Sequence, residues 1–243
     1  MAINVDTVYK TVLSLLNKEQ RGYMTPDEFN RVATQVQLEI FEKYFDDLNQ
    51  QLRVPQADVD YADRITAIDE QISVFKRFQN PTYVANYFDL SVITDLYRIG
   101  TVVYNTPIGG PIELERLPRS SFYNIQRSPL TASTTSFPSY LYENNRLYVS
   151  PATINVGFTA NTPGDISIDY VKKPSSVSWG FTVGNLGQYN YNPITSTQFE
   201  LLPSEQTTVI LKILIYAGLI IEDRTVIQVA SGQVQQQQQN SKS

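Results

Sequence analysis

The stretch TPDEFNRVATQVQLEIFEKYF, residues 25–45, contains the clearest folding signal of the sequence. Thr25 can cap a helix, Pro26 suits the first helical position, and Glu28 completes a capping box. Acidic side chains in the first turn also interact favourably with the helix dipole. The stretch therefore predicts a long helix with one apolar face. The apolar positions are Phe29, Val32, Val36, Ile40, Phe41, Tyr44, Phe45 and Leu48.

Two more helices are predicted on either side of this one. Residues 5–17 repeat apolar side chains at helical spacing. A further helix follows Asp58 or Asp60 and ends at Asn80-Pro81. Its apolar side needs a partner, which the long helix supplies, so we expect a small antiparallel bundle. The apolar positions of the later helix are Tyr61, Ile65, Ile68, Ile72 and Phe75.

The last fifty residues are predicted to be helical again. Residues 202–205 resemble a helix start with proline in the first turn. Residues 209–217 are apolar almost all round, which predicts a deeply buried helix. Gly218 is expected to cap or break it. Asp223 can cap another helix that contains Val226, Ile227, Ala230 and Val234, before the glutamine-rich end that starts at Gln235.

Between these helical regions the sequence changes character. From about residue 82 to 192, Pro, Gly, Ser, Thr and Asn are frequent, and short apolar runs alternate with turn signals. Such spacing favours a small sandwich or barrel. Residues 131–136 and 179–193 are expected to be loops. The predicted strand runs are residues 96–104, 111–117, 140–149 and 165–171, with turns at residues 105–110 and 143–145.

This order predicts an α+β protein in which N- and C-terminal helices form a bundle and an antiparallel β domain is inserted between them. Residues 1–80 form the first helical part, and residues 81–198 form the inserted domain. Residues 199–234 complete the bundle, and residues 235–243 form a polar tail.

Composition excludes several kinds of chemistry. The 243 residues include no Cys and no His. Zinc sites built from Cys and His are therefore impossible, and so are Ser-His-Asp and Cys-His catalysis. The net charge is −5, and the sequence has no extended cluster of Lys and Arg of the kind that binds nucleic acid. The N-terminus does not resemble a signal peptide, and residues 209–221 are too short to span a bilayer. We expect a protein made in the cytoplasm, without a cofactor or membrane contact.

Acidic residues do not form a recognisable catalytic pair. Glu113 and Glu115 alternate along a predicted strand and share a face, which is more typical of an exposed strand face than of an acid–base pair. A glycoside hydrolase needs only two carboxylates, so that activity is not excluded by sequence. Our prediction is that the protein is not an enzyme.

Aromatic residues indicate a role in binding. The chain has 16 Tyr and 11 Phe, and Tyr is enriched at protein interfaces. Trp179, Tyr189 and Tyr191 lie in one segment that can stack on another subunit or on a sugar. The C-terminal helix supplies a second set of candidate contact residues, which are Val226, Ile227, Ala230, Val234 and Gln235.

Three groups of motifs together resemble a family of virion structural proteins from crAss-like phages, which are short-tailed phages of Bacteroidetes hosts. The first is RGYMTPDEFN, residues 21–30, with the apolar helix that follows it. The second is LYRIGTVVY, residues 96–104, with ERLPR at 115–119. The third is DYVKKP at 169–174, FELLPSE at 199–205 and the apolar region 213–227.

The resemblance implies a head-to-tail connector, a twelvefold ring beneath the portal protein. Its partners would be further copies of itself, the portal, and adjacent ring or tail proteins. DNA would pass through without specific binding, and the location would be the neck or tail of the virion. Such chain ends often dock on a neighbouring ring, so deleting residues 223–243 is expected to leave a folded subunit that cannot join the portal. The alternative is a tail-associated receptor- or glycan-binding module.

Overall fold

The predicted capping box is present at the start of α2 (Pro26–Gln51). The backbone N–H of Thr25 donates to the Glu28 carboxylate at 2.9 Å. The N–H of Glu28 donates in return to the Thr25 hydroxyl at 3.4 Å. The hydrogen bonds from Thr25 lower the pKa of Glu28 below its ordinary value. Local sequence therefore fixes where this long helix begins.

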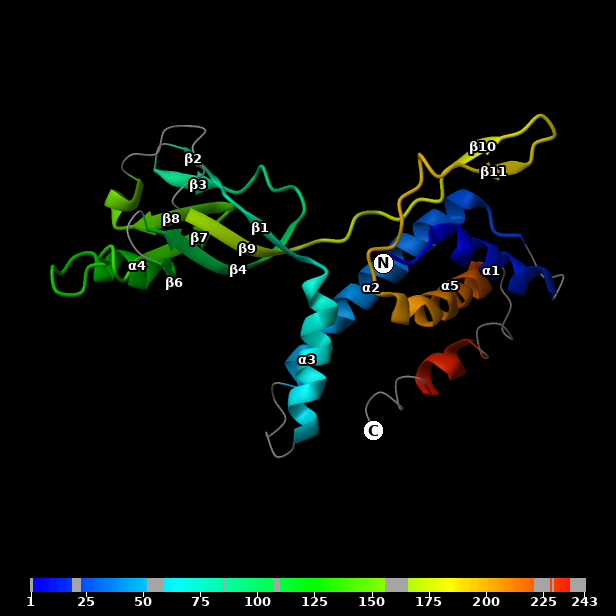
Figure 1. Ribbon diagram of the computed structural model, residues 1–243, viewed down its shortest axis with the longest axis horizontal. Helices are drawn as coiled ribbons and strands as arrows, with labels where there is room; N and C mark the ends of the chain where they lie inside the picture. The colour runs from blue at the N-terminus through cyan, green and yellow to red at the C-terminus, as the bar shows by residue number, and fades with distance from the viewer. Residues whose placement is uncertain are drawn as a thin grey trace. The chain divides into compact units, whose positions relative to one another are not determined.

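The computed structural model describes residues 2–18, 23–51, 59–84, 86–106, 110–155, 166–220, 228 and 230–236. Figure 1 shows a mixed α+β protein, as the sequence predicts. The chain divides into two compact units. We call residues 1–74 and 174–243 the helical unit, and residues 75–173 the β unit.

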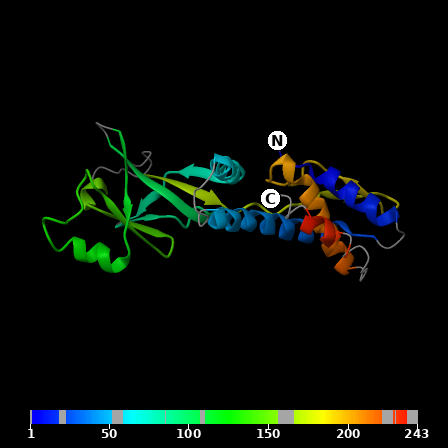
Figure 2. The ribbon, with the colours of Figure 1, turned by 90° about the horizontal axis from the view of Figure 1, so that it is seen from below.

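Helices from both ends of the chain lie in the helical unit. α1 spans Val5–Lys18, α3 spans Val59–Ser73, and α5 spans Gln206–Ile220 after the 3-10 turn Pro203–Glu205. α5, drawn in orange, lies beside the blue helices α1 and α2 in both views (Figures 1 and 2), and it contacts both. α3 contacts α2. Along α5 the residues Val209, Ile213 and Ala217 are buried.

Some features of these helices differ from the prediction. α5 is only partly buried, because the half-buried Ile210, Leu211 and Ile215 lie between its buried positions. Gly218 does not end it, since the helix continues to Ile220. Within the described residues, no helix combines the length and apolar character that crossing a bilayer requires.

The β unit contains two open sheets. One has the strand order β1-β9-β4-β5 and the other has the order β2-β3-β8-β7-β6. The β7–β8 turn is made by Asn144 and Asn145, whose φ values are +50° and +57°, as the predicted turn requires. The strands are β1 (Lys76–Gln79), β2 (Thr82–Val84), β3 (Tyr87–Asp89), β4 (Leu96–Asn105), β5 (Pro111–Glu113), β6 (Glu115–Arg116), β7 (Ser139–Glu143), β8 (Arg146–Ser150) and β9 (Ile166–Lys172).

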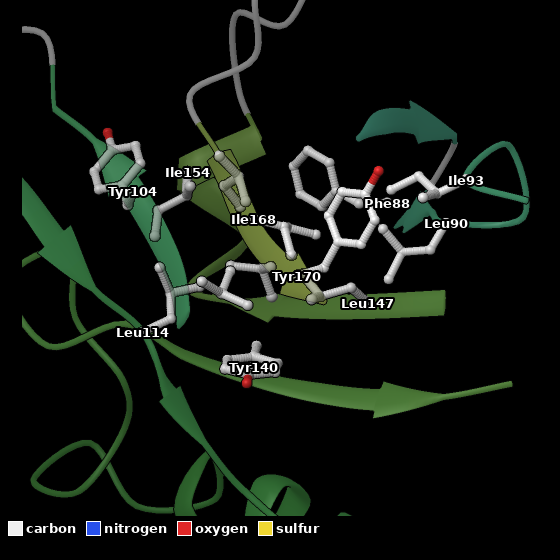
Figure 3. Packing of buried hydrophobic residues seen from close by; sticks show 13 residues of the cluster. Phe88, Leu90, Ile93, Tyr104, Leu114, Tyr140, Leu147, Ile154, Ile168 and Tyr170 are labelled. Carbon is white, nitrogen blue, oxygen red and sulfur yellow. The ribbon is translucent and has the colours of Figure 1, made fainter. Parts of the chain in front are cut away.

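One apolar core joins the two sheets. Ile168 and Tyr170 of β9 point into the same interior as Leu147 of β8 and Tyr140 of β7 (Figure 3). Two facing sheets over one core correspond to the sandwich form of the prediction. The barrel form is wrong, because neither sheet closes on itself among the described residues.

The boundaries of the units also differ from the predicted domains. The β unit begins at Phe75 rather than 81, because residues 76–79 pair as a strand with β9 instead of extending α3. It ends at Lys173 rather than 198, because residues 174–199 belong to the helical unit. The predicted loop 179–193 contains a hairpin, β10 (Phe181–Val183) with β11 (Tyr189–Tyr191).

Candidate interaction surface

One face of α2 holds the extended segment that precedes β10. The backbone N–H of Trp179 donates to the Asn30 side chain at 2.7 Å. The N–H of Val177 donates to the Thr34 hydroxyl at 3.1 Å. Asn30 and Thr34 are four residues apart and share a helix face, while Val177 and Trp179 alternate along the extended segment. The helix therefore fixes this segment through side chains.

Gln37, one helical turn further on, is buried and completes the row. Its side-chain N–H donates to the Ser175 carbonyl at 2.8 Å. Its side-chain oxygen accepts from the Glu200 N–H, also at 2.8 Å. The side-chain amide of Gln37 thus binds both ends of the segment 175–200, which contains the hairpin. An unpaired buried amide group costs about 1–3 kcal/mol, so these two bonds make Gln37 hard to replace.

Trp179 anchors the hairpin to the helices. Its side chain is only 4% exposed. The indole ring centroid lies 4.4 Å from that of Tyr9, and the indole N–H donates to Asp6 at 3.1 Å. The rings of Phe181 and Tyr191 stack on it, at 5.9 Å and 5.7 Å between centroids. Trp179 was predicted to contact a partner. Its ring is inaccessible to one, because it is packed between the hairpin and the helices.

The tip of the hairpin is fixed by its own backbone. The N–H of Gly184 donates to the Gln188 carbonyl at 2.8 Å, and the N–H of Gly187 donates to the Gly184 carbonyl at 2.9 Å. Gly187 has a φ of +80°, which glycine adopts at little cost. The hairpin, drawn in yellow in Figure 1, therefore has a hydrogen-bonded turn that positions its outer side chains.

Two apolar side chains of this region are uncovered, one in the hairpin turn and one just after β11. Leu186 is 93% exposed and Ile194 is 92% exposed. The predicted contact residue Tyr189 is partly exposed, and Tyr191 is half-buried. Residues 174–199 contain no Asp, Glu, Lys or Arg and form the longest uncharged run of the sequence. Interface cores are depleted of charge and enriched in aromatics, so this region fits a protein contact. We call Val183, Leu186, Tyr189 and Ile194 the hairpin surface.

A second exposed apolar region lies in the β unit. We call residues 128–137, which follow α4 (Arg119–Ile125), the 128–137 loop. Its Leu130 is 96% exposed and its Phe137 is 82% exposed. Backbone bonds between Thr134 and Phe137, at 3.3 Å and 3.1 Å, close its last turn. Residues 128–142 are again uncharged.

The C-terminal candidate residues are only partly described. Val226 and Ile227 lie outside the described residues. Residues 230–236 are helical. Ala230 is buried, Val234 is half-buried and Gln235 is exposed. A partner could therefore reach Gln235 and part of Val234, whereas Ala230 is covered by its own chain.

Two carboxylates of the β unit that share a predicted strand lie in the open. Glu113 and Glu115 are both exposed and line one open hollow of about 550 Å³ with Arg116 and Tyr140. General acid–base pairs are usually shielded from bulk water so that their pKa values separate, and this hollow gives no such shielding. Among the described residues, no three acidic side chains are grouped so that they could hold a metal ion.

Sequence reasoning found part of this arrangement. It identified Trp179, Tyr189 and Tyr191 as one set, and the hairpin does bring them together. It did not find the exposed tip residues or the row on α2. The uncharged run 174–199 was a signal for the tip. Nothing local marks the row, because its partners lie more than 130 residues away. The missed residues are Asn30, Thr34, Gln37, Leu186, Ile194, Leu130 and Phe137.

Neither a protein-family model nor a curated protein matches this chain.

Proposed function

We propose that this chain is a structural subunit of the head-to-tail connector of a short-tailed phage, where copies form a ring around the DNA passage. One observation carries the proposal. Leu186 and Ile194 on the helical unit, and Leu130 and Phe137 on the β unit, are each more than 80% exposed. Exposed apolar groups gathered on built loops are typical of surfaces that become buried in an assembly.

A ring subunit needs two different surfaces that meet when copies are arranged around an axis. The hairpin surface and the 128–137 loop are two such surfaces, and they belong to different units. Both are fixed by internal hydrogen bonds, so little freedom is lost when they bind. These features support an assembly role more directly than they support a catalytic one.

The same exposure bears on the glycan-binding alternative. Sugar recognition by stacking needs an accessible aromatic face, and Trp179 is buried against Tyr9. The most exposed side chains of the hairpin surface, Leu186 and Ile194, are aliphatic and cannot stack on a sugar in that way. The observations therefore favour a protein partner.

The C-terminal segment is proposed to contact the portal. Gln235 and part of Val234 are accessible on the helical stretch 230–236. Deleting residues 223–243 should leave the subunit folded, with its circular dichroism almost unchanged, and should abolish binding to the portal in size-exclusion chromatography. A truncated subunit that still joins the portal would remove this part of the proposal.

The proposal as a whole is tested by assembly. The purified chain is mixed with the portal protein of the same phage, and the particles are imaged by negative-stain microscopy. We expect an added ring beneath the portal, twelvefold in end views. Portal alone is the control. The proposal fails if no ring forms and the chain is also missing from purified virions analysed by mass spectrometry.

A further inference from the structure

We infer that the hairpin surface of one copy docks on the 128–137 loop of the next copy of this chain. This inference rests on the proposed function and names the contact that links neighbouring subunits. In this arrangement a second copy of the chain covers each of the two apolar surfaces. Charge, composition and exposure each support it.

The two units carry opposite net charges. The β unit has nine Lys and Arg against seven Asp and Glu, which is a net charge of +2. The helical unit has ten basic and 17 acidic residues, which is a net charge of −7. Contact between two helical units would bring like charges together. Contact between the helical unit of one copy and the β unit of the next brings opposite charges together, which favours association.

Two basic side chains precede the receiving loop in the sequence. Arg119 and Arg127 precede it, on and just after α4, and both are exposed. Arg119 also pairs with Glu143 at 2.9 Å. The loop itself is uncharged over residues 128–142. The loop is thus an uncharged stretch on a unit of net positive charge, which suits an uncharged hairpin on a unit of net negative charge.

The hairpin and the loop suit each other because both are free of charge. Burying a charged group without a partner is costly, so a contact core is most easily built where both sides lack charge. Residues 174–199 and 128–142 meet this condition on the two units. Among the described residues, each run also carries the most exposed large apolar side chain of its unit, Leu186 at 93% and Leu130 at 96%.

The proposed contact lies between copies. Cross-linking separates it from a contact within one chain, because a bond within one chain would leave only monomers. Because it joins two different surfaces, it repeats from copy to copy and can close into a ring.

Cysteine cross-linking tests the contact directly, since the native chain has no Cys. Leu186→Cys and Leu130→Cys are combined in one chain, assembled with the portal protein, and oxidised mildly. We expect a ladder of covalent multimers on a denaturing gel. Mixing the two single variants should instead give dimers and no longer products. Leu186→Cys with Val92→Cys is the matched control, because Val92 is exposed elsewhere on the β unit.

The outcomes separate this inference from the proposed function. Rings that are visible by microscopy without a Leu186–Leu130 cross-link overturn the inference and leave the ring subunit standing. A Leu186→Cys variant that cross-links to itself also overturns it, because that indicates a symmetric hairpin–hairpin contact. Absence of rings for the unmodified chain counts against the proposed function itself.

A second measurement does not depend on oxidation. Leu186→Ser should leave the circular dichroism and melting of the free subunit unchanged, because this residue is 93% exposed. Burial of a leucine contributes about 1.5–3 kcal/mol, so ring assembly should weaken by roughly tenfold or more. Asn185→Ser, beside it in the same turn, should have little effect. Equal assembly by the Leu186→Ser variant and the native chain would overturn the inference.

Discussion

The helical unit and the β unit are built in opposite ways. The β unit is one continuous stretch, residues 75–173, whereas the helical unit combines residues 1–74 with residues 174–243. In the β unit, two sheets pack over one core, and all their strands come from that single stretch. In the helical unit, a helix near one end of the chain must find a segment near the other. The helical unit therefore depends on contacts that local sequence cannot form.

Three long-range features join the two parts of the helical unit. Ile3 forms a β-bridge with Phe199. The backbone N–H of Val5 donates to the Gln198 side chain at 2.7 Å. The row on α2 binds residues 175–179. Each of these features ties the segment that contains the hairpin to the N-terminal part of the chain. The hairpin therefore keeps its position only while the helical unit is folded.

The largest predicted effect comes from ending the chain at Lys173. This removes α5 and residues 175–179, so α1 and α2 lose their apolar partner and much of their helical signal in circular dichroism. The β unit keeps every strand of both sheets and should retain dispersed NMR signals. The matched control replaces residues 75–173 by a short Gly-Ser linker and should keep the helical signal. Native-like helices in the truncated chain would show that α1 and α2 do not need residues 174–243 to fold.

A pair of core substitutions should separate the two units next. Trp179→Ala should destabilise the helical unit by about 3–5 kcal/mol, and Leu147→Ala should destabilise the β unit by about 2–5 kcal/mol. Both side chains are buried in their own unit. Hydrogen exchange followed by mass spectrometry assigns the loss of protection to each unit. Equal loss in both units for either variant would show that they unfold as one.

Gln37→Ala should have a smaller effect, confined to the helical unit. It leaves the Ser175 carbonyl and the Glu200 N–H without their partner, at a cost of about 1–3 kcal/mol. Urea unfolding followed by tryptophan fluorescence measures it, because Trp179 is the single tryptophan of the chain and lies beside this row. The exposed Gln35→Ala on the same helix is the control and should stay within about 0.5 kcal/mol. Identical unfolding curves for the two variants would contradict the proposed row.

The smallest predicted effect concerns pH and the helical unit alone. Burial alone would raise the pKa of Glu39, but hydrogen bonds from Tyr216 and Lys212 outweigh it and lower that pKa below its ordinary value of 4.5. Lys212 lies 3.1 Å away and Tyr216 donates to the same carboxylate. The stabilisation of the folded state by the Glu39 charge is therefore complete above about pH 4.5. It is lost as the pH falls through the lowered pKa of Glu39.

Thermal melts of Glu39→Gln and the native chain test this between pH 7 and pH 3. The variant should be less stable by about 1 kcal/mol or less at pH 7, since the pair is partly exposed. Its difference from the native chain should shrink as the pH falls. A difference that stays constant down to pH 3 would show that the Glu39 charge does not contribute.

Much of the architecture could be predicted from local patterns. The start of α2 follows from Thr25 and Glu28, and the β7–β8 turn follows from Asn144 and Asn145. These signals act over three or four residues, so neighbours in sequence are enough to satisfy them. The strand run 96–104 is likewise confirmed as part of β4, and residues 166–171 of the run 165–171 are confirmed as part of β9.

Predictions that required a distant partner were less accurate. Residues 76–79 looked like the end of a helix, but they form a strand because β9 lies beside them. Residues 179–193 looked like a loop because their strands are only three residues long. The stacking of Phe181 and Tyr191 on Trp179 supports this short hairpin, and such stacking cannot be read from spacing.

By itself, the sequence determined most of the helical and extended segments, the α+β class, and the absence of Cys and His chemistry. These depend on composition and on periods of two to four residues. Only the tertiary structure decided that residues 174–199 belong with the helices, that Trp179 is buried, and that Leu186 is exposed. The reason is that bonds such as Gln37 to Ser175 join residues 138 positions apart, and a chain acquires them only when the whole unit is folded.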